Sequence, residues 1–361
     1  MKRFFLVAGA RPNFMKIAPL HAALSARGAE LVLVHTGQHY DPLMSDVFFQ
    51  ELGIPVPDIH LGIGSGDRRM QTRKIIHGLL PHLAERDPDA VVVVGDVTSS
   101  AAAALAASMA DVPVVHVEAG LRSFNWRMPE ELNRMIADHY AQAHFVTEPT
   151  AVGHLRAEGV APERIFLVGN VMIDTLRRIE PAARAAKVAE RLGLPARYGV
   201  LTLHRPENVD DPEVLVSLWR TVAEISREIP IVFPVHPRTR QRIESLASDG
   251  AEGIRLVEPQ GYTDMLSLTA SATAVFTDSG GLQEETTALG VPCVTLRAET
   301  ERPVTVDVGT SEVVGRDPGR IRAAWRRIAA GEWKRGAVPE HWDGKAAERI
   351  ADILMGLSFD L

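Results

Sequence analysis

The sequence predicts an α/β chain with two parallel sheets, and three observations support this class. Short runs rich in Val, Ile, Leu and Phe recur without polar alternation, which is typical of strands buried on both faces. Amphipathic helix patterns separate these runs, and such alternation of strand and helix favours parallel sheets. The runs also fall into two groups, on either side of a helical, charged stretch at residues 172–192.

The apolar runs place the predicted strands in order. Strands are expected at residues 4–8, 31–35, 90–94, 114–117, 165–168, 200–203, 231–235, 254–257, 274–277 and 291–296. Helices between them are expected at residues 12–27, 98–110, 129–143 and 212–227. Residues 345–357 carry their apolar side chains on one stripe, as a packed terminal helix does.

The length of 361 residues is sufficient for two domains, each with its own core. We expect an N-terminal domain at residues 1–170 and a C-terminal domain at residues 171–344, with the link near residues 169–176. The terminal helix, in residues 345–361, is expected to pack on the N-terminal domain.

Composition excludes several classes of protein. The chain is 46% hydrophobic and 24% charged, as globular enzymes are, and its net charge of −7 provides no global field for nucleic acid. The single cysteine, Cys293, excludes an intrachain disulfide and is expected to be a buried structural thiol. The apolar N-terminal run is too short for a signal peptide, and no run of 18 apolar residues predicts a membrane span. We therefore expect a cytoplasmic protein.

Polar and titratable residues follow the predicted strands, where ligands of open parallel sheets bind. In chain order they are Arg11, Gln38, His39, Asp96, Glu118, His204, Arg205, His236 and the turn Asp278-Ser-Gly-Gly281. Acids suited to proton transfer belong to the first half, and donors suited to phosphate belong to the second. This distribution predicts a ligand site in a cleft between two domains.

The turn at residues 276–286 gives the most specific sign of phosphate binding. A strand ends, Gly280 and Gly281 allow close backbone approach, and a helix starts with free amides. Glu285, on that helix, either accepts hydrogen bonds from ribose hydroxyls or simply counters the helix dipole. No P-loop, no G-x-G-x-x-G and no zinc motif occurs, so we expect neither a metal nor a dinucleotide.

Several segments together resemble the non-hydrolysing UDP-N-acetylglucosamine 2-epimerase family. They are Gly9-Ala-Arg-Pro-Asn-Phe-Met-Lys16, Gly95-Asp96, His116-Val-Glu-Ala-Gly-Leu-Arg122, Met128-Pro-Glu-Glu-Leu-Asn-Arg134, His204-Arg-Pro-Glu-Asn208, Asp278-Ser-Gly-Gly-Leu-Gln-Glu-Glu285 and Thr300-Glu-Arg-Pro303. The similarity runs in order from about residue 3 to about residue 357. It implies a GT-B fold, in which two Rossmann-like domains face each other across a cleft and the C-terminal one binds UDP. It also implies interconversion of UDP-GlcNAc and UDP-ManNAc for polysaccharide biosynthesis, no cofactor, and a homodimer.

The resemblance also assigns residues. The family's UDP contacts fall on Arg11, Lys16, His204, Gln260, Ser279, Gly280, Gly281, Glu285 and Arg302. Its acid and base carboxylates fall on Asp96, Glu118 and Glu130, and His204 is counted with them as catalytic. By itself, Glu130 would be interpreted as a helix-capping acid after Pro129. Met265 stands where the family often has an aromatic residue near uracil. Which carboxylate is the base stays open.

Bacterial members of the family can carry a regulatory second UDP-GlcNAc site, and Gln38, His39, Arg73 and Arg205 match part of it. Tyr40 and Asp41 depart from that pattern. Other segments resemble relatives acting on UDP-2,3-diacetamido-glucuronic acid, so this substrate is the main alternative. More remote alternatives are a GT-B glycosyltransferase, a hydrolysing epimerase and a non-catalytic UDP-sugar sensor.

Overall fold

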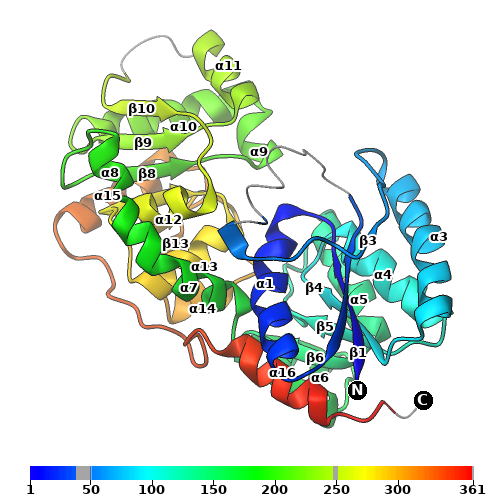
Figure 1. The fold of residues 1–361 in the computed structure, drawn as a ribbon. Coiled ribbons are helices and arrows are strands. Elements are labelled where there is room, and N and C mark those ends of the chain that lie inside the picture. Colours follow the sequence, from blue (N-terminus) through cyan, green and yellow to red (C-terminus); the bar gives the residue numbers. More distant parts are fainter. Residues whose placement is uncertain (38–48, 50, 247–250, 360–361) are drawn as a thin grey trace. The chain divides into compact units, whose positions relative to one another are not determined.

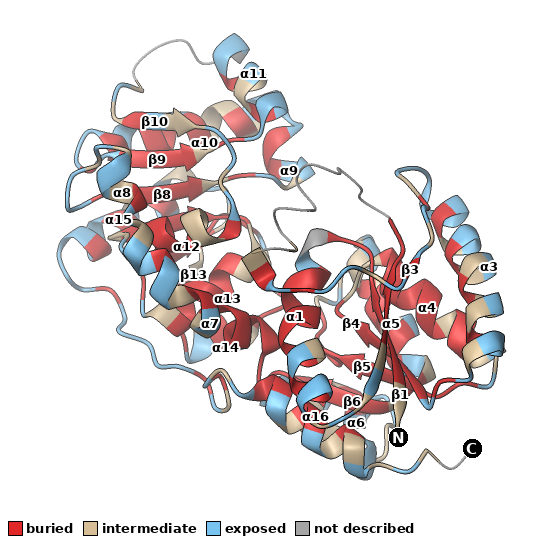
Figure 2. Cartoon of the chain, viewed as in Figure 1, coloured by how far each residue is buried: buried red, intermediate tan, exposed pale blue. Residues whose placement is uncertain are grey.

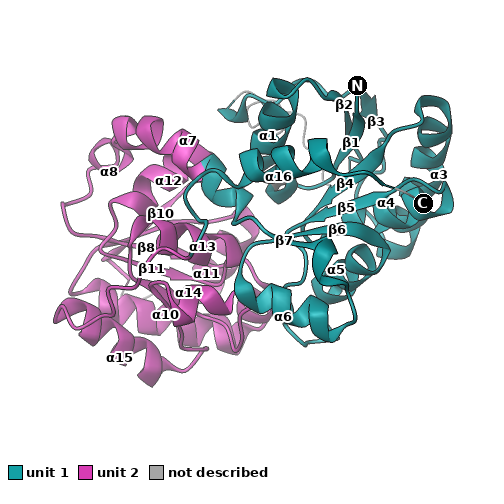
Figure 3. Ribbon diagram, turned by 90° about the horizontal axis from the view of Figure 1, so that it is seen from below, with its two compact units in different colours: residues 1–175, 340–361 teal, residues 176–339 magenta. Residues whose placement is uncertain are grey.

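The computed structural model describes residues 1–37, 49, 51–246 and 251–359 (Figure 1). The chain forms two compact units, shown in different colours in Figure 3. Unit 1 comprises Met1–Thr175 and Glu340–Leu361, and unit 2 comprises Leu176–Pro339. The helix α7 (Val171–Ala186) continues from one unit into the other.

The described part of unit 1 contains a seven-stranded parallel sheet with the order β3-β2-β1-β4-β5-β6-β7. Its strands are β1 (Arg3–Ala8), β2 (Glu30–His35), β3 (Ile59–His60), β4 (Ala90–Val94), β5 (Val114–Val117), β6 (Ala141–Val146) and β7 (Ile165–Leu167). Its helices are α1 (Arg11–Ala26), α3 (Arg68–Arg86), α4 (Thr98–Met109), α5 (Pro129–Tyr140), α6 (Pro149–Ala157) and α16 (Ala346–Gly356), with a short 3-10 turn at Pro162–Arg164. The strands β2 and β3 lie on one side of β1, and β4 to β7 follow on its other side, so the order of strand addition reverses between β1 and β4.

The described part of unit 2 contains a six-stranded parallel sheet with the order β10-β9-β8-β11-β12-β13. Its strands are β8 (Gly199–Thr202), β9 (Ile231–Pro234), β10 (Ile254–Val257), β11 (Ala274–Thr277), β12 (Cys293–Thr295) and β13 (Ser311–Val313). Its helices are α8 (Val188–Arg191), α9 (Pro206–Val209), α10 (Pro212–Ser226), α11 (Pro237–Leu246), α12 (Tyr262–Ala270), α13 (Gly280–Leu289), α14 (Pro303–Asp307) and α15 (Pro318–Ala329). Here the order of addition reverses between β8 and β11.

Both sheets are buried on both faces, as the unalternating apolar runs predict (Figure 2). In unit 2, Leu201 and Phe276 belong to the core on one face of the sheet, whereas Val200 and Val275 belong to a separate core on the other. In unit 1, α3, α4 and α5 pack against one another over one core. The predicted α/β class with two parallel sheets is confirmed.

One predicted helix needs correction, and some short strands were missed. The helix expected at residues 129–143 ends at Tyr140, and β6 starts at the next residue. Ala141 turns to an extended backbone with ψ near 135°, and because no Gly or Pro marks this change, the sequence gives little sign of it. The short strands β3 and β13 were not expected either, since each spans only two or three residues.

The C-terminal segment of the chain is held within unit 1. The carboxylate of Asp174 accepts hydrogen bonds from the backbone amides of Ala346 and Ala347, at 3.1 and 2.6 Å. The indole of Trp342 donates to the carbonyl of Thr147 at 2.9 Å. Among the described helices, none combines the length and the apolar character that crossing a bilayer requires.

Candidate active site

The predicted functional residues gather at the points where the order of strand addition reverses. In unit 1, Arg11 and Lys16 belong to α1, directly after β1, and Asp96 follows β4. In unit 2, His204 follows β8 and Ser279 follows β11. Because open α/β sheets bind ligands at such switch points, each unit by itself presents a candidate ligand-binding edge.

Lys16 and Glu118 form a buried ion pair in unit 1. The Nζ atom of Lys16 lies 2.6 Å from Oε2 of Glu118, and the two side chains are 7% and 0% exposed. Glu118 directly follows β5 and has a φ of 71°, a conformation that costs a non-glycine residue energy. A Cβ on Gly95 would come within 2.7 Å of the Lys16 Nζ atom, so glycine is needed there to leave room for the pair.

Asp96 is the second predicted carboxylate, and two residues of α5 hold it. Arg134, which is fully buried, forms an ion pair with the Asp96 carboxylate. The side-chain amide of Asn133 donates to the backbone carbonyl of Asp96 at 2.9 Å. Since Gly95 donates its amide to Val117, the turns carrying Asp96 and Glu118 are adjacent.

Glu130 and Glu131 begin α5 but occupy different environments. Glu130 is half-buried in the first turn of the helix. Glu131 is 2% exposed and accepts hydrogen bonds from the amide and hydroxyl of Ser123, at 2.7 and 2.8 Å, and from the amide of Phe124. Glu131 therefore fixes the loop that precedes the helix.

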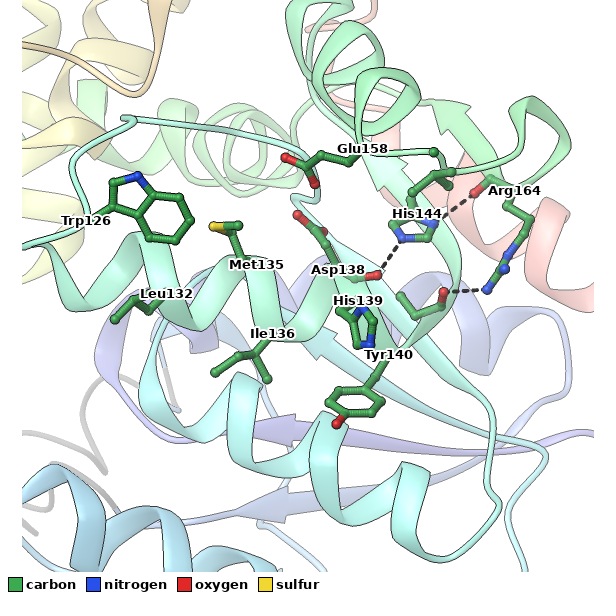
Figure 4. A pocket seen from close by; sticks show the side chains of 13 residues that line it. Trp126, Leu132, Met135, Ile136, Asp138, His139, Tyr140, His144, Glu158 and Arg164 are labelled. Atoms are coloured by element: carbon green, nitrogen blue, oxygen red, sulfur yellow. Dashed lines mark hydrogen bonds between the residues drawn. The ribbon is translucent and has the colours of Figure 1, made fainter.

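A pocket of about 630 Å³ lies on the outer side of α5, and its side chains are drawn in Figure 4. Trp126 and Met135 line one end, whereas Arg164 lies at the other. Asp138 and His144 are buried residues of its lining. None of the predicted site residues lines this pocket.

In unit 2, a buried aspartate holds the predicted His204. Asp278 is fully buried and accepts the backbone amides of His204 and Arg205, and its Oδ1 lies 2.8 Å from Nδ1 of His204. Burial would raise the pKa of Asp278, but the hydrogen bonds from His204 and Arg205 outweigh it and lower that pKa. The His204 side chain is 57% exposed, so its Nε2 is available to a ligand.

The start of α13 is open around its glycines. Ser279 caps the helix by accepting the amide of Leu282 at 3.4 Å. A Cβ on Gly280 would meet no atom within 4 Å, and one on Gly281 would meet only the Ser279 hydroxyl, at 4.0 Å. Neither glycine has a positive φ. Packing and backbone conformation therefore do not require glycine here, whereas close approach of a ligand would.

Acidic residues on α13 lie beneath this turn. Burial raises the pKa of Glu285 to about 8, while Tyr262 opposes the shift and Glu284 adds to it. Glu284 forms an ion pair with Arg302, at 2.6 Å between Oε1 and Nε, and both side chains are buried. Arg302 thus lies at this end of unit 2 with its guanidinium anchored by the helix that starts at the glycines.

The remaining predicted residues are placed less tightly. Gln260, in the loop after β10, donates to the carbonyl of Glu258 at 2.6 Å. Met265 of α12 packs against the core on one face of the unit 2 sheet, so part of its side chain has a structural role. Arg11 begins α1, and its side chain lies outside the part of the chain that the structure describes.

The structure describes two of the four regulatory candidates, one in each unit. Gln38 and His39 lie outside them. Arg73 is exposed on α3 of unit 1, where it lines a pocket of about 460 Å³. Arg205 belongs to unit 2, and its Nη2 lies 3.8 Å from Oε1 of Glu301.

Sequence reasoning gave no role to several residues that organise the site. Arg134 and Asn133 hold Asp96, and Asp278 holds His204. One signal was available, since Arg134 stands four residues after Glu130 and so faces the same side of a helix. Among the described residues, no group of three or more His, Cys, Asp or Glu side chains is placed to hold a metal ion.

Comparison with known proteins identifies the family. A family model described as UDP-N-acetylglucosamine 2-epimerase matches residues 22–355. A relative of that name from Methanococcus maripaludis is 37% identical over 371 residues, which cover 99% of each chain. The UDP-2,3-diacetamido-2,3-dideoxy-D-glucuronate 2-epimerase of Pseudomonas aeruginosa is 37% identical over 361 residues, covering 98% of this chain and all of the relative.

A solved structure agrees with this. The UDP-GlcNAc 2-epimerase of Methanocaldococcus jannaschii, in complex with UDP-GlcNAc and UDP, superimposes with a TM-score of 0.90 at 38% identity. The match covers 99% of this chain and 100% of that one. The chain therefore belongs to the UDP-N-acetylglucosamine 2-epimerase family and is an epimerase, that is, an isomerase.

Proposed function

We propose that this epimerase interconverts UDP-GlcNAc and UDP-ManNAc by eliminating UDP and adding it back through 2-acetamidoglucal. The observation that carries the proposal is the placement of complementary groups at the switch points of the two sheets. Unit 1 offers Asp96 and Glu118 on adjacent turns, each paired with a buried cation. Unit 2 offers the open helix start at Gly280 and Gly281.

The nucleotide end of the proposed site is the start of α13. Free backbone amides and the positive end of the helix dipole attract a diphosphate. Because no protein atom fills the space beside Gly280 and Gly281, a phosphate can come close to the backbone there. Arg302 and the exposed Nε2 of His204 supply further donors. We assign Glu285 to the ribose hydroxyls, and Gln260 and Met265 to the uracil end.

The chemistry explains why carboxylates are needed beside this nucleotide site. C2 of the sugar has no adjacent carbonyl, so removal of its proton alone would leave an unstabilised carbanion. In the proposed reaction the C2–H electron pair forms the C1=C2 double bond as the C1–O bond breaks and UDP leaves with that bond's electrons. A carboxylate takes the C2 proton. Return of a proton to the opposite face, with attack of UDP on C1, gives the epimer.

We propose that Asp96, Glu118 and Glu130 move these protons. Asp96 and Glu118 lie on neighbouring turns, since the amide of Gly95 donates to the carbonyl of Val117, the residue before Glu118. Lys16 lies beside both turns, and we assign it to the leaving diphosphate as well as to Glu118. As a proton converts Glu118 to its neutral form, the positive charge of Lys16 becomes available to the departing UDP.

A second substrate has specific support. The Pseudomonas aeruginosa relative, which is 37% identical over nearly the whole chain, is named for UDP-2,3-diacetamido-2,3-dideoxy-D-glucuronate. This substrate undergoes the same inversion at C2 and differs at C3 and C6. The glycosyltransferase alternative loses its support, because the matched family and the named relatives are epimerases.

We further propose that the enzyme acts as a homodimer in the cytoplasm and supplies polysaccharide biosynthesis, as the resemblance implies. Exposed Met70 and Met109, 52% and 60% accessible, give α3 and α4 of unit 1 apolar surface for self-association. Sedimentation at several protein concentrations tests the dimer. A monomer at micromolar concentration would contradict this part of the proposal.

The substrate is tested by incubating the purified enzyme in D₂O with UDP-GlcNAc, UDP-ManNAc or the diacetamido-glucuronate nucleotide. NMR then follows the C2 configuration, the C2 deuterium content and free UDP. We expect deuterium at C2 of both epimers of one substrate without accumulation of UDP in proportion to turnover. Proportional release of UDP would indicate a hydrolysing epimerase, and tight binding without exchange would indicate a sensor.

A further inference from the structure

His116 makes two short contacts at the end of β5, where it is fully buried. Its Nδ1 lies 2.6 Å from Oδ1 of Asp138, and its Nε2 lies 2.9 Å from the carbonyl oxygen of Gly95. The ring therefore bridges the Asp138 carboxylate and the backbone carbonyl of Gly95.

Asp138 is surrounded by hydrogen-bond donors. Arg122 lies 2.7 Å from its second oxygen, and the backbone amide of Gly120 donates to the carboxylate at 3.1 Å. Burial would raise the pKa of Asp138, but His116 and Arg122 outweigh it and lower that pKa to about 2. These donors therefore favour the ionised carboxylate.

The His116–Asp138 pair connects two turns. On one side, His116 holds the carbonyl of Gly95, the residue before Asp96. On the other side, Asp138 holds the amide of Gly120, two residues after Glu118. Glu118 has a φ of 71°, which costs a non-glycine residue energy, whereas Gly95 adopts its φ of 63° freely. One hydrogen-bonded pair thus fixes the backbone beside both carboxylates.

We propose that His116 and Asp138 are positioning residues that set the spacing of Asp96 and Glu118 for proton transfer at C2. Neither residue is assigned a contact with the substrate. The proposal rests on the proposed function, because it concerns the carboxylates that act there. Displacement of a reacting group by about 1 Å can cost about a hundredfold in rate, so a pair that holds both turns has a large effect on turnover.

Several charged groups lie close to the His116–Asp138 pair, and they surround any residue substituted there. Lys16, Glu118 and Asp96 face the Gly95 turn, Arg134 reaches it from α5, and Arg122 lies against Asp138.

His144 of β6 donates through Nε2 to the backbone carbonyl of Asp138, a contact drawn as a dashed line in Figure 4. Asp138→Asn removes one negative charge and keeps these neighbours. The amide of asparagine is a weaker acceptor than a carboxylate, so its contacts with His116 and with the amide of Gly120 weaken.

The test compares wild type, Asp138→Asn and a control, Asp174→Asn. Asp174 is also a buried aspartate of unit 1 that accepts two backbone amides, but these belong to α16. Two properties are measured: amide hydrogen exchange at residues 95–98 and 118–121, and the kinetics of C2 exchange, as kcat and KM. His116→Gln is the second variant, because it removes the other member of the pair.

In Asp138→Asn, amide exchange at both turns should accelerate, kcat should fall about 10- to 100-fold, and KM should change by less than about threefold. His116→Gln should change the same properties in the same direction. The control should leave the two turns and both kinetic constants unchanged.

Unchanged amide exchange at both turns in Asp138→Asn would overturn the inference. His116→Gln decides the question if Asp138→Asn does not fold. If no UDP-sugar exchanges its C2 hydrogen in the wild-type enzyme, the proposed function fails instead. The amide exchange still decides whether the pair holds the turns.

Discussion

At the residue scale, the candidate site depends on side chains that fix other side chains. Asp278 anchors His204, and Arg134 anchors Asp96. Each anchor is buried, and each is charged, so loss of one partner would leave an unpaired charge away from water. The reactive groups are therefore oriented before any ligand arrives, which is what catalysis by preorganised groups requires.

Gly280 and Gly281 provide a first prediction. Substitution of either by alanine should leave the fold intact and raise the free energy of unfolding by up to about 1 kcal/mol, because the added methyl meets no protein atom. The same methyl would occupy the space of the phosphate, so Kd for UDP should rise at least about tenfold. Calorimetric titration with UDP and thermal unfolding measure the two effects.

Gly356→Ala serves as the control for these variants. Gly356 is also an open helical glycine, but it lies at the end of α16 in unit 1. Its substitution should not change the Kd for UDP. Normal UDP affinity in both Gly280→Ala and Gly281→Ala would contradict the assignment of the phosphate site.

Glu285 provides a second prediction, on the dependence of stability on pH. Its folded-state pKa of about 8 lies above the usual value of 4.5, so the folded state favours the protonated carboxyl. This contribution is fully present below the unfolded pKa and is lost as pH rises through the folded pKa. Relative to wild type, Glu285→Gln should gain about 1–3 kcal/mol of unfolding free energy between pH 5 and pH 8.

Denaturant unfolding of both proteins at a series of pH values measures this gain. Glutamine preserves the shape of the side chain and cannot ionise, so the variant isolates the titration of Glu285 from that of other groups. An equal pH dependence in the two proteins would show that Glu285 ionises normally in the folded state.

At the element scale, the sequence predicted strands well where they are buried and apolar. All ten predicted runs coincide with observed strands, because burial on both faces leaves an unbroken apolar signal. It failed at β6, where the chain passes from helix to strand between Tyr140 and Ala141 without a breaking residue. Tertiary pairing of β6 between β5 and β7 decides the structure there, and one sequence does not reveal such pairing.

The same limit applies to the site. Strand ends and motifs indicated Asp96, Glu118 and His204, since these residue types stand at expected turns. The partners Arg134 and Asp278 are recognised only once α5 and β11 are packed beside those turns. Gln260 lies in a loop, and there the sequence carries little information about the direction in which a side chain points.

Gly169 provides a prediction about an element junction. It has a φ of 91°, and a Cβ there would overlap the carbonyl of His341 in the C-terminal segment. Gly159 has a similar φ of 88°, but a Cβ there would meet nothing within 4 Å. Gly159→Ala should therefore cost only the backbone strain, about 1–2 kcal/mol, whereas Gly169→Ala should cost clearly more.

Thermal unfolding of the two variants separates backbone strain from the packing of the C-terminal segment. Hydrogen exchange in α16 should increase in Gly169→Ala and stay unchanged in Gly159→Ala. Equal losses of stability would show that the approach of residue 341 to this glycine contributes nothing.

At the scale of the whole molecule, the proposed function divides the reaction between two doubly wound sheets. The described switch point of unit 1 presents paired carboxylates, and that of unit 2 presents an open helix start with cationic and imidazole groups. In this proposal, proton transfer and diphosphate binding belong to separate scaffolds of the same class. The account requires that both sets serve one reaction, in which UDP leaves and returns while C2 exchanges its hydrogen.

That requirement is tested most directly by deuterium incorporation at C2 of UDP-GlcNAc in D₂O, measured for wild type, Asp96→Asn and Glu118→Gln. We predict label at C2 in the wild-type reaction, loss of at least about a hundredfold in the exchange rate of both variants, and UDP affinity close to wild type in each. Epimerisation by the wild-type enzyme with no deuterium at C2, or full exchange in both variants, would contradict the account.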